Sequence, residues 1–588
     1  MSRLTLYCLV FLGAIAGLVT WLSRSTERAS DSADLDLQAQ FELTESVLGP
    51  QKQKAIWDSE HATFEIETHL GGRFLRAVES RTVDQVAGIF SEELRADILN
   101  VDSPRSRRLG PITEWRTDAA ADLKNSVDRE GLAEWLIRSL DPIAEVDGGR
   151  LRVLQIHPVK DHEHEWDVEL LWSAHGTSSA GQSVAVESHH DATVRYVDQD
   201  ELLQAATIIR WQVDSRLIRM SDDQLMTEVT SEVGLDQVSL PDNWKLPLAE
   251  QNLYNFQMAV EDYDRDGFPD IVIASGPAGL KPILLKSEQG LRFHDVTAES
   301  GLTPWSGPSF LVSWIDYDND GFPDLLLGDR LYHNERGQSF VDVTETSGFT
   351  PGFNPMSCSV ADFDADGLLD LYIIYQVTFA PSEETVPWVG DDDSGARNEL
   401  WHNEGNGRFR NITDQAHASG GGRESMAVTS LFYDGDHFPD LYIANDFGAN
   451  VLLRNLGNGE FEDVSKQAAC SDFATSMGVS SGDLDNDGIA EIYVANMYSK
   501  MGRRIIGAVS ADDYPSGVFE QIQGSCAGNT LYGKASLSDP YRELSHSLEV
   551  NAVGWAFATA MADFNGDGWL DLYGVSGYRS FQRREPDG

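Results

Sequence analysis

One acidic nine-residue pattern recurs six times after residue 226, and its regular spacing constrains the fold more than any other feature. The copies are DYDRDGFPD (262–270), DYDNDGFPD (316–324), DFDADGLLD (362–370), FYDGDHFPD (432–440), DLDNDGIAE (483–491) and DFNGDGWLD (563–571). A marker such as FVDVTETSGF precedes each copy, and after the first copy the marker begins 22 or 23 residues before its loop. Constant spacing of this kind indicates one structural module repeated in order.

Each repeat also carries the signals of four short strands. A small, apolar segment such as MSCSVADF leads into the acidic loop, and a strand such as DLYIAND follows the loop. A further apolar segment, an Asn-Gly turn such as Asn458-Gly459 and the next marker complete the repeat, and Asn-Gly between apolar stretches is a strong hairpin signal. Four short antiparallel strands per repeat predict a mainly β fold, a β-propeller with one blade per repeat.

The acidic pattern has the chemistry of a calcium loop. Oxygen-bearing side chains fall at positions 1, 3, 5 and 9, and glycine falls at position 6 in every copy but the fourth. Ca²⁺ takes six to eight oxygen ligands, and the backbone carbonyl at position 7 can add one. Neither Cys nor His stands at a ligand position, which disfavours Zn²⁺, and Mg²⁺ gives up its waters reluctantly. Asp and Gly also form ordinary turns, but five near-complete copies in register favour metal loops.

The sequence therefore predicts bound Ca²⁺ in five of the six loops. The predicted ligands are Asp262, Asp264, Asp266, Asp270, Asp316, Asp318, Asp320, Asp324, Asp362, Asp364, Asp366, Asp370, Asp483, Asp485, Asp487, Glu491, Asp563, Asn565, Asp567 and Asp571. In the remaining copy Phe432 replaces the first ligand and His437 replaces the glycine. That loop is predicted to keep its turn without metal, or to bind it weakly.

The loops, with the LYxxN and FxDVTxxxG stretches after them, resemble FG-GAP (VCBS) repeats, the blade repeats of integrin α-subunit propellers and of many bacterial exported proteins. The stretch LYHNERGQSFVDVTETSGF is most similar to the cartilage acidic protein group and its ASPIC/UnbV relatives. The resemblance covers residues 226–588 and implies a propeller, calcium-binding loops and a role in adhesion or recognition. The family propeller usually has seven blades, whereas six repeats are visible here. We therefore expect either a truncated chain or a last blade closed by the marker at 226–235.

The N-terminal end carries the signals of export. Residues 4–22, LTLYCLVFLGAIAGLVTWL, contain no charge and are near the minimum length for a bilayer span. No small-residue cleavage site follows, so an uncleaved anchor over residues 1–22 is predicted, with a cleaved signal as the alternative. Residues 23–55 are polar and predict a linker. The bulk of the chain is expected to be extracellular or periplasmic, anchored to the membrane.

Residues 56–225 lack the acidic pattern and predict a separate α+β domain. Apolar residues at three- and four-residue spacing in FEIETHLGGRFLRAVESRTVDQVAGIFSEEL indicate helix. Long alternating segments such as HEWDVELLWSA and SVAVESHHDATVRYV then indicate strands. This order loosely resembles NTF2-like cone domains.

Composition limits the partners. Asp and Glu total 95 against 44 Lys and Arg, a formal charge of −51, which repels phosphate backbones and attracts divalent cations. Nucleic acid is therefore excluded as the main partner. The four cysteines, Cys8, Cys358, Cys470 and Cys526, form no C-x-x-C pair, which excludes a disulfide-dense scaffold. A bridge among the last three stays open.

Two functions remain. The first is a non-enzymatic module that recognises an extracellular protein or glycan, through long insertions at about 377–397 and 498–528 on one face. In the second insertion, the residues predicted to contact the partner are Met501, Arg503, Arg504, Tyr514 and Phe519. The alternative is an extracellular hydrolase or lyase built on the propeller or on the α+β domain. GVSSG (478–482) matches a nucleophile elbow but runs straight into a metal loop, which favours a strand.

Overall fold

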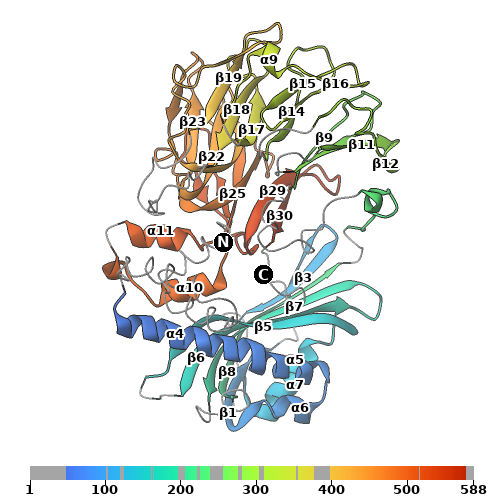
Figure 1. Ribbon diagram of the computed structural model, residues 1–588. Coiled ribbons are helices and arrows are strands. Elements are labelled where there is room, and N and C mark those ends of the chain that lie inside the picture. The colour runs from blue at the N-terminus through green and yellow to red at the C-terminus, as the bar shows by residue number, and fades with distance from the viewer. Residues whose placement is uncertain are drawn as a thin grey trace, which may run out of the picture. The chain divides into compact units, whose positions relative to one another are not determined.

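The chain forms two compact units (Figure 1). The N-terminal unit comprises the described residues up to Glu228 together with Arg504–Asp513, and the repeat unit comprises Val229–Arg503 and the chain from Tyr514 onward. The N-terminal unit is therefore discontinuous in sequence. The computed structural model describes residues 48–100, 104–118, 125–160, 162, 164–196, 206–221, 226–238, 256–275, 281–303, 310–352, 355–376, 397–514 and 517–577.

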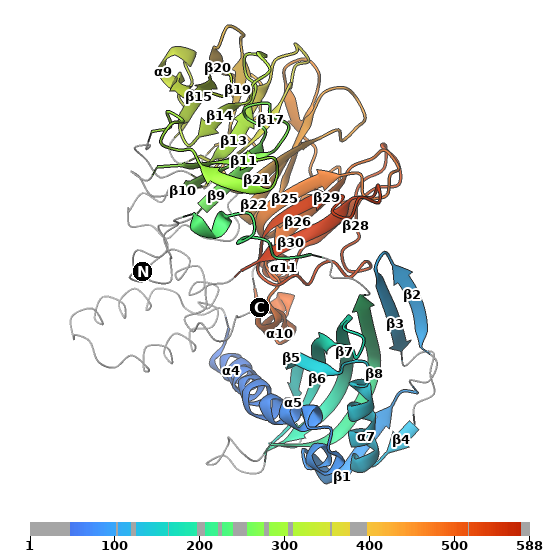
Figure 2. The ribbon, with the colours of Figure 1, turned by 90° about the vertical axis from the view of Figure 1, so that its right-hand side faces the viewer.

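The N-terminal unit is a curved sheet covered on one face by helices (Figure 2). The strands follow the order β2-β3-β8-β7-β6-β5, and β1 pairs with both β8 and β4. The strands are β1 (Phe90–Ile98), β2 (Arg105–Leu109), β3 (Ile112–Asp118), β4 (Asn125–Val127), β5 (Glu145–Pro158), β6 (Glu165–Thr177), β7 (Ser183–Arg195) and β8 (Thr207–Ser221). The helices are α4 (Pro50–Glu65), the π-helical turn η2 (Ile66–Leu70), α5 (Gly71–Glu79), α6 (Val83–Ala87) and α7 (Arg129–Ser139). Helix α4 begins inside the stretch predicted as a linker.

The alternation read from the sequence builds this sheet. In β6 the residues Val168, Leu170 and Trp172 are buried, because successive side chains of a strand point to opposite faces. Trp172 and Phe74 of α5 meet in a T-shaped contact with ring centroids 5.9 Å apart. His190 of β7 is fully buried 4.5 Å from the ring of Trp211, and burial lowers its pKa to about 3. His190 is thus a neutral core residue.

The segment Arg504–Asp513 completes the N-terminal unit by binding α4. Arg504 is only 7% exposed and donates to Glu60 from Nε at 3.0 Å and from Nη2 at 2.8 Å. Its Nη1 donates to the carbonyl of Val153 at 2.8 Å, and Lys52 forms an ion pair with Asp513. The guanidinium of Arg504, expected to face an external partner, is therefore engaged within this unit.

The repeat unit consists of consecutive antiparallel modules, which we number 1 to 6, and modules 4 and 5 are joined into one eight-stranded sheet. In each, the acidic loop joins the first and second strands. Module 1 holds β9 (Phe256–Glu261), β10 (Asp270–Ser275), β11 (Ile283–Glu288) and β12 (Arg292–Asp295); module 2 holds β13 (Val312–Ile315), β14 (Asp324–Leu327), β15 (Arg330–Asn334) and β16 (Phe340–Asp342); module 3 holds β17 (Pro355–Ala361), β18 (Asp370–Tyr375), β19 (Glu399–Asn403) and β20 (Phe409–Asn411).

The later modules repeat the arrangement. Module 4 holds β21 (Glu424–Leu431), β22 (Asp440–Ala449), β23 (Val451–Asn455) and β24 (Phe461–Asp463); module 5 holds β25 (Phe473–Gly482), β26 (Glu491–Asn496), β27 (Thr530–Gly533) and β28 (Arg542–Glu543); module 6 has β29 (Ala556–Ala562) and β30 (Asp571–Ser576). The short helices of this unit are η3 (Leu235–Gln237), α9 (Thr344–Ser347) and α11 (Val518–Gly524). The helix α10 (Lys500–Gly507) runs into the segment Arg504–Asp513 of the N-terminal unit, and η5 (Ala511–Asp513) ends that segment. GVSSG lies within β25, whereas a nucleophile elbow requires a turn from a strand into a helix.

Neighbouring modules pack face to face through the second strand of each. Leu325 and Leu327 of β14 share a core with Val272 of module 1, whereas Leu326 between them shares a core with Leu371 of module 3. Successive side chains of a strand point to opposite faces, so alternate residues of β14 face module 1 and module 3. The strand is apolar throughout because both of its faces are buried. Face-to-face packing of this kind is what the predicted propeller blades require.

Among the described residues, the outer faces of the first and last modules have no such neighbour. Met258 and Val260 of β9 are 64% and 54% exposed, and Tyr573 and Val575 of β30 are 47% and 46% exposed. The marker at 226–235 belongs beside module 1, where the carbonyl of Val233 accepts from Phe293 N at 2.9 Å. Three later markers contact the following module in the same way, since the carbonyls of Ser300, Ala416 and Ala468 accept from Phe340 N, Phe461 N and Tyr541 N. The structure therefore places the marker at 226–235 beside module 1 and does not support a closing role for it at module 6.

Two further expectations meet the structure here. No helix within the described residues is long and apolar enough to cross a membrane. The helix predicted at residues 4–22 lies outside those residues. In the described part of the chain Cys358, Cys470 and Cys526 are free thiols.

Candidate metal centres in the acidic loops

Five of the six acidic loops turn through left-handed backbone at positions 4 and 6. In module 2 these are Asn319 (φ 57°) and Gly321 (φ 90°), and module 3 has Ala365 (φ 59°) and Gly367 (φ 91°). A side chain is strained at such φ values, which explains the glycine at position 6. His437 of module 4 keeps φ outside this region, so that loop follows a different path at its sixth position.

The carboxylate at position 1 holds the loop closed. Asp316 Oδ1 accepts from Asp320 N at 3.1 Å, and its Oδ2 accepts from Gly321 N at 3.0 Å. The same pair of bonds forms at Asp262, Asp362, Asp483 and Asp563. Phe432 cannot make them because it has no side-chain oxygen. Position 5 still holds the module 4 turn, since Asp436 Oδ1 accepts from Phe438 N at 2.8 Å.

The carboxylate at position 9 is an anchor as well as a predicted ligand. Asp324 is fully buried, and it accepts from Asn334 N at 2.7 Å and from Tyr317 N at 3.2 Å. Burial raises the pKa of Asp324 to about 7, against the lowering effect of these hydrogen bonds. Burial likewise raises the pKa of Asp270 and Asp370 to about 6. An uncompensated negative charge at this position is therefore costly.

In modules 2 to 4 a buried asparagine at the end of the third strand ties the module to the one before it. Asn334 Nδ2 donates to the carbonyls of Tyr263 and Pro323, both at 2.8 Å. Asn403 and Asn455 do the same to Tyr317 and Phe363 of their preceding modules, at 2.8 and 2.7 Å. The sequence analysis missed this role. The recurrence of HN or RN just before the Gly-containing turn was the available signal.

The loop carboxylates converge into groups that could hold a cation. Positions 1, 3 and 5 come together in module 2 (Asp316, Asp318, Asp320) and in module 3 (Asp362, Asp364, Asp366), and positions 1, 3 and 9 do so in module 1 (Asp262, Asp264, Asp270). In each group the candidate ligand atoms lie within 4.8 Å of one another. Oxygens at this spacing suit a hard divalent cation, and their mutual repulsion is relieved when one binds.

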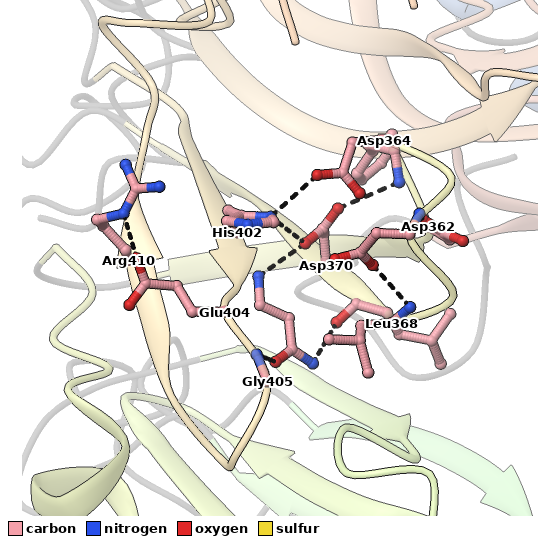
Figure 3. Close-up of polar contacts among 12 residues, drawn as sticks. Asp362, Asp364, Leu368, Asp370, His402, Glu404, Gly405 and Arg410 are labelled. Carbon is pink, nitrogen blue, oxygen red and sulfur yellow. Dashed lines mark hydrogen bonds and ion pairs between the residues drawn. The ribbon is translucent and has the colours of Figure 1, made fainter.

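Modules 2 and 3 add a histidine that the sequence analysis missed. Figure 3 shows His402 of β19 facing the acidic loop, with Nδ1 3.4 Å from Asp364 Oδ2 and 3.2 Å from Asp370 Oδ1. His333 of β15 lies at the same two distances from Asp318 and Asp324. The third-strand histidine falls outside the nine-residue pattern, so counting ligands within the loop alone cannot find it.

Loops 5 and 6 fold in the same way. Glu491 Oε2 accepts from Leu484 N at 2.8 Å, and burial raises its pKa to about 7. In module 6, Asp571 Oδ2 accepts from Phe564 N at 3.1 Å, and Asn565 Oδ1 accepts from Asp567 N at 2.9 Å. Five loops therefore share one closed geometry, and the loop of module 4 departs from it at its first and sixth positions.

The repeated geometry coincides with a known repeat type. The family model described as "FG-GAP-like repeat" matches residues 256–327, 328–373 and 433–494. The chain carries FG-GAP-like repeats. The matched spans include the acidic loops of modules 1, 2, 3 and 5 and the module 4 loop from its second residue. The acidic loop of module 6 lies outside the match and forms the same bonds. No curated protein is significantly similar to the chain in sequence.

Two solved structures show limited likeness. A protein described as a proposed aromatic ring hydroxylase from Novosphingobium aromaticivorans aligns with 28% of this chain and 90% of its own, with 14% identity and a TM-score of 0.17. The V. cholerae biofilm matrix protein Bap1 aligns with 49% of this chain and 40% of its own, with 12% identity and a TM-score of 0.25. At these scores neither likeness bears on function.

Proposed function

We propose that the FG-GAP-like repeats form a calcium-stabilised β-propeller in an exported, membrane-anchored protein that recognises an extracellular protein or glycan without catalysing a reaction. The observation that carries this proposal is the recurrence of one closed acidic loop with converging carboxylates. A formal charge of −51 would keep the protein soluble and favour divalent cations over anionic partners.

Calcium would act as a structural counter-ion in these loops. The side chains at positions 1, 3, 5 and 9 and the carbonyl at position 7 are the groups that would hold it, and position 9 also anchors the neighbouring strand. A ligand that binds only the folded state stabilises it by about 2.7 kcal/mol at a concentration one hundred times its Kd. Exposed loops of this kind suit the millimolar affinities of extracellular calcium modules.

The insertion after β26 offers the recognition surface. Tyr514 and Phe519 stack with ring centroids 6.2 Å apart, and the Arg503 guanidinium lies 5.6 Å from the ring of Tyr498. Aromatic and arginine side chains are enriched at interfaces. The insertion at 377–396 lies outside the described residues, so only its end at Arg397 can be placed.

Thermal unfolding with calcium and with EGTA tests the calcium part. Because several sites contribute at once, we expect chelation to lower the Tm by about 10 °C. Equilibrium dialysis against millimolar calcium, followed by elemental analysis, should find more calcium on the protein side than in the buffer. An unchanged Tm together with no excess calcium on the protein side would contradict the proposal.

Retention on native cell surfaces tests the recognition part. The purified chain should bind such cells in calcium and be released by EGTA. The double variant Tyr514→Ala, Phe519→Ala should lose retention while keeping its calcium-dependent Tm. Equal retention of the variant would show that recognition occurs elsewhere or not at all through this insertion.

A further inference from the structure

The third strand of each module places one variable residue against the acidic loop. Backbone bonds of 2.7 Å from Ser287, Asn334, Asn403 and Asn455 to the position 9 carboxylates fix the equivalent positions in modules 1 to 4. The residue just before these positions is Lys286, His333, His402 and Arg454 in turn. In module 5 the strand pairing puts Gly533 there.

Modules 1 and 4 carry a permanent cation at this place. The Lys286 ammonium pairs with Asp264 and lies 3.5 Å from Asp266 Oδ2. Arg454 Nε lies 3.7 Å from Asp434 Oδ2. Lysine and arginine have no lone pair to offer a metal, and their charge repels an incoming divalent ion. In these modules the chain supplies its own counter-ion.

The module 1 loop nevertheless keeps a vacant acceptor. Asp264 is nine-tenths buried, and among the described residues no group donates a hydrogen bond to its Oδ1. A buried acceptor without a donor is unfavourable. If Lys286 were replaced by a neutral residue, a cation held jointly by Asp262, Asp264 and Asp270 would satisfy it. Lys286 satisfies only the other oxygen of Asp264.

Modules 2 and 3 differ because imidazole can be neutral and can ligate. His333 Nδ1 is buried and has no hydrogen-bond partner in the described part of the chain, yet it lies 3.4 Å from Asp318 and 3.2 Å from Asp324. Two carboxylates and an imidazole nitrogen form a mixed ligand set. Such a set accepts first-row transition cations as well as calcium.

We propose that this third-strand residue selects the cation of its loop: Lys286 and Arg454 exclude a divalent ion, whereas His333 and His402 admit one and add a nitrogen ligand. This inference rests on the proposed calcium function of the loops. Gly533 leaves module 5 with oxygen ligands alone. The modules then form a graded set, although their nine-residue loops are similar.

Calorimetric titration with Ca²⁺ tests the exclusion. Lys286→Gln should bind one additional equivalent of calcium, and Lys286→Arg, which keeps the charge, should bind the wild-type number. Arg454→Gln should gain nothing, because Phe432 leaves that loop without its first ligand. His333→Lys should lose one equivalent. Thermal unfolding of each variant in EGTA verifies that it is folded.

Titration with Zn²⁺ alone tests the nitrogen ligand. The double variant His333→Ala, His402→Ala should bind zinc at least tenfold more weakly while keeping its calcium equivalents. Equal zinc affinity, or an unchanged calcium number in Lys286→Gln, would overturn the selector role. A wild-type protein that binds no calcium would instead overturn the proposed function, so the two failures can be told apart.

Discussion

The acidic loops of modules 2 and 4 join equivalent strands and have equal length, yet they differ at three positions, of which the first and the sixth change the loop's contacts and backbone path. In module 2, Asp316 closes the loop and Gly321 lets it turn, whereas module 4 has Phe432 and His437 there. Both keep the buried position 9 carboxylate, Asp324 or Asp440, bonded to the third strand at 2.7 Å. The difference separates two roles: position 9 holds the sheet together, and position 1 completes the cation site.

The largest expected effect comes from the third position of the module 2 loop, and the third position of the module 4 loop is its control. In saturating calcium, Asp318→Ala should lower the free energy of unfolding by about 2.7 kcal/mol, since it belongs to two ligand groups of module 2. Asp434→Ala should cost less than about 0.5 kcal/mol. Chemical denaturation measures both. Equal losses for the two variants would mean that module 4 binds calcium as module 2 does.

The next effect concerns the tie between modules. Asn334→Ala should destabilise the protein by about 2 kcal/mol, because the carbonyls of Tyr263 and Pro323 would lose their donor while buried. The loss should be the same in calcium and in EGTA, unlike that of Asp318→Ala. Asn458→Ala, at an exposed asparagine, is the matched control and should change stability little.

Position 9 predicts an unusual pH dependence of the calcium-free protein. Burial raises the pKa of Asp324 and Asp440 to about 7, above the unfolded value, so the folded state binds more protons between pH 8 and pH 5. The free energy of unfolding in EGTA should then rise as pH falls through this window, by on the order of 1–2 kcal/mol. In calcium the trend should reverse, because protons compete with the ion. Urea denaturation across this range measures both slopes.

The smallest effect tests the turn itself. Gly321→Ala should cost about 1 kcal/mol, because its φ of 90° is unfavourable for a residue with a Cβ. His437→Ala in module 4 should be nearly neutral, since its backbone is not left-handed. Comparable losses at the two positions would indicate that a general property of the loop, rather than φ, sets the cost.

The loops and strands could be predicted because their signals are local. Gly321 is required by its own left-handed backbone, and the apolar run at Leu325–Leu327 follows from burial on both faces. The ligand prediction was incomplete for the opposite reason. His333 reaches Asp318 only through the register of β14 with β15, which pairs Leu325 with Tyr332 and which loop spacing does not encode.

Long-range contacts account for the other gaps. Arginine is a residue type that is common at interfaces, which is why Arg504 was predicted to contact an external partner. Its partner in the structure is Glu60, which lies 444 positions earlier in the chain. Neither residue lies in a recognisable pattern, so their contact could not be anticipated. The start of α4 at Pro50 could not be predicted because the helix is mostly polar and shows little apolar periodicity.

The discontinuity of the N-terminal unit sets an order of events during synthesis. A chain that emerges from its N-terminus presents Lys52 and Glu60 long before Arg504 and Asp513 exist to pair with them. Modules 1 to 4 must be translated in the interval. The first-made unit is therefore finished late, and a ribosome halted before residue 504 would leave it without its last segment.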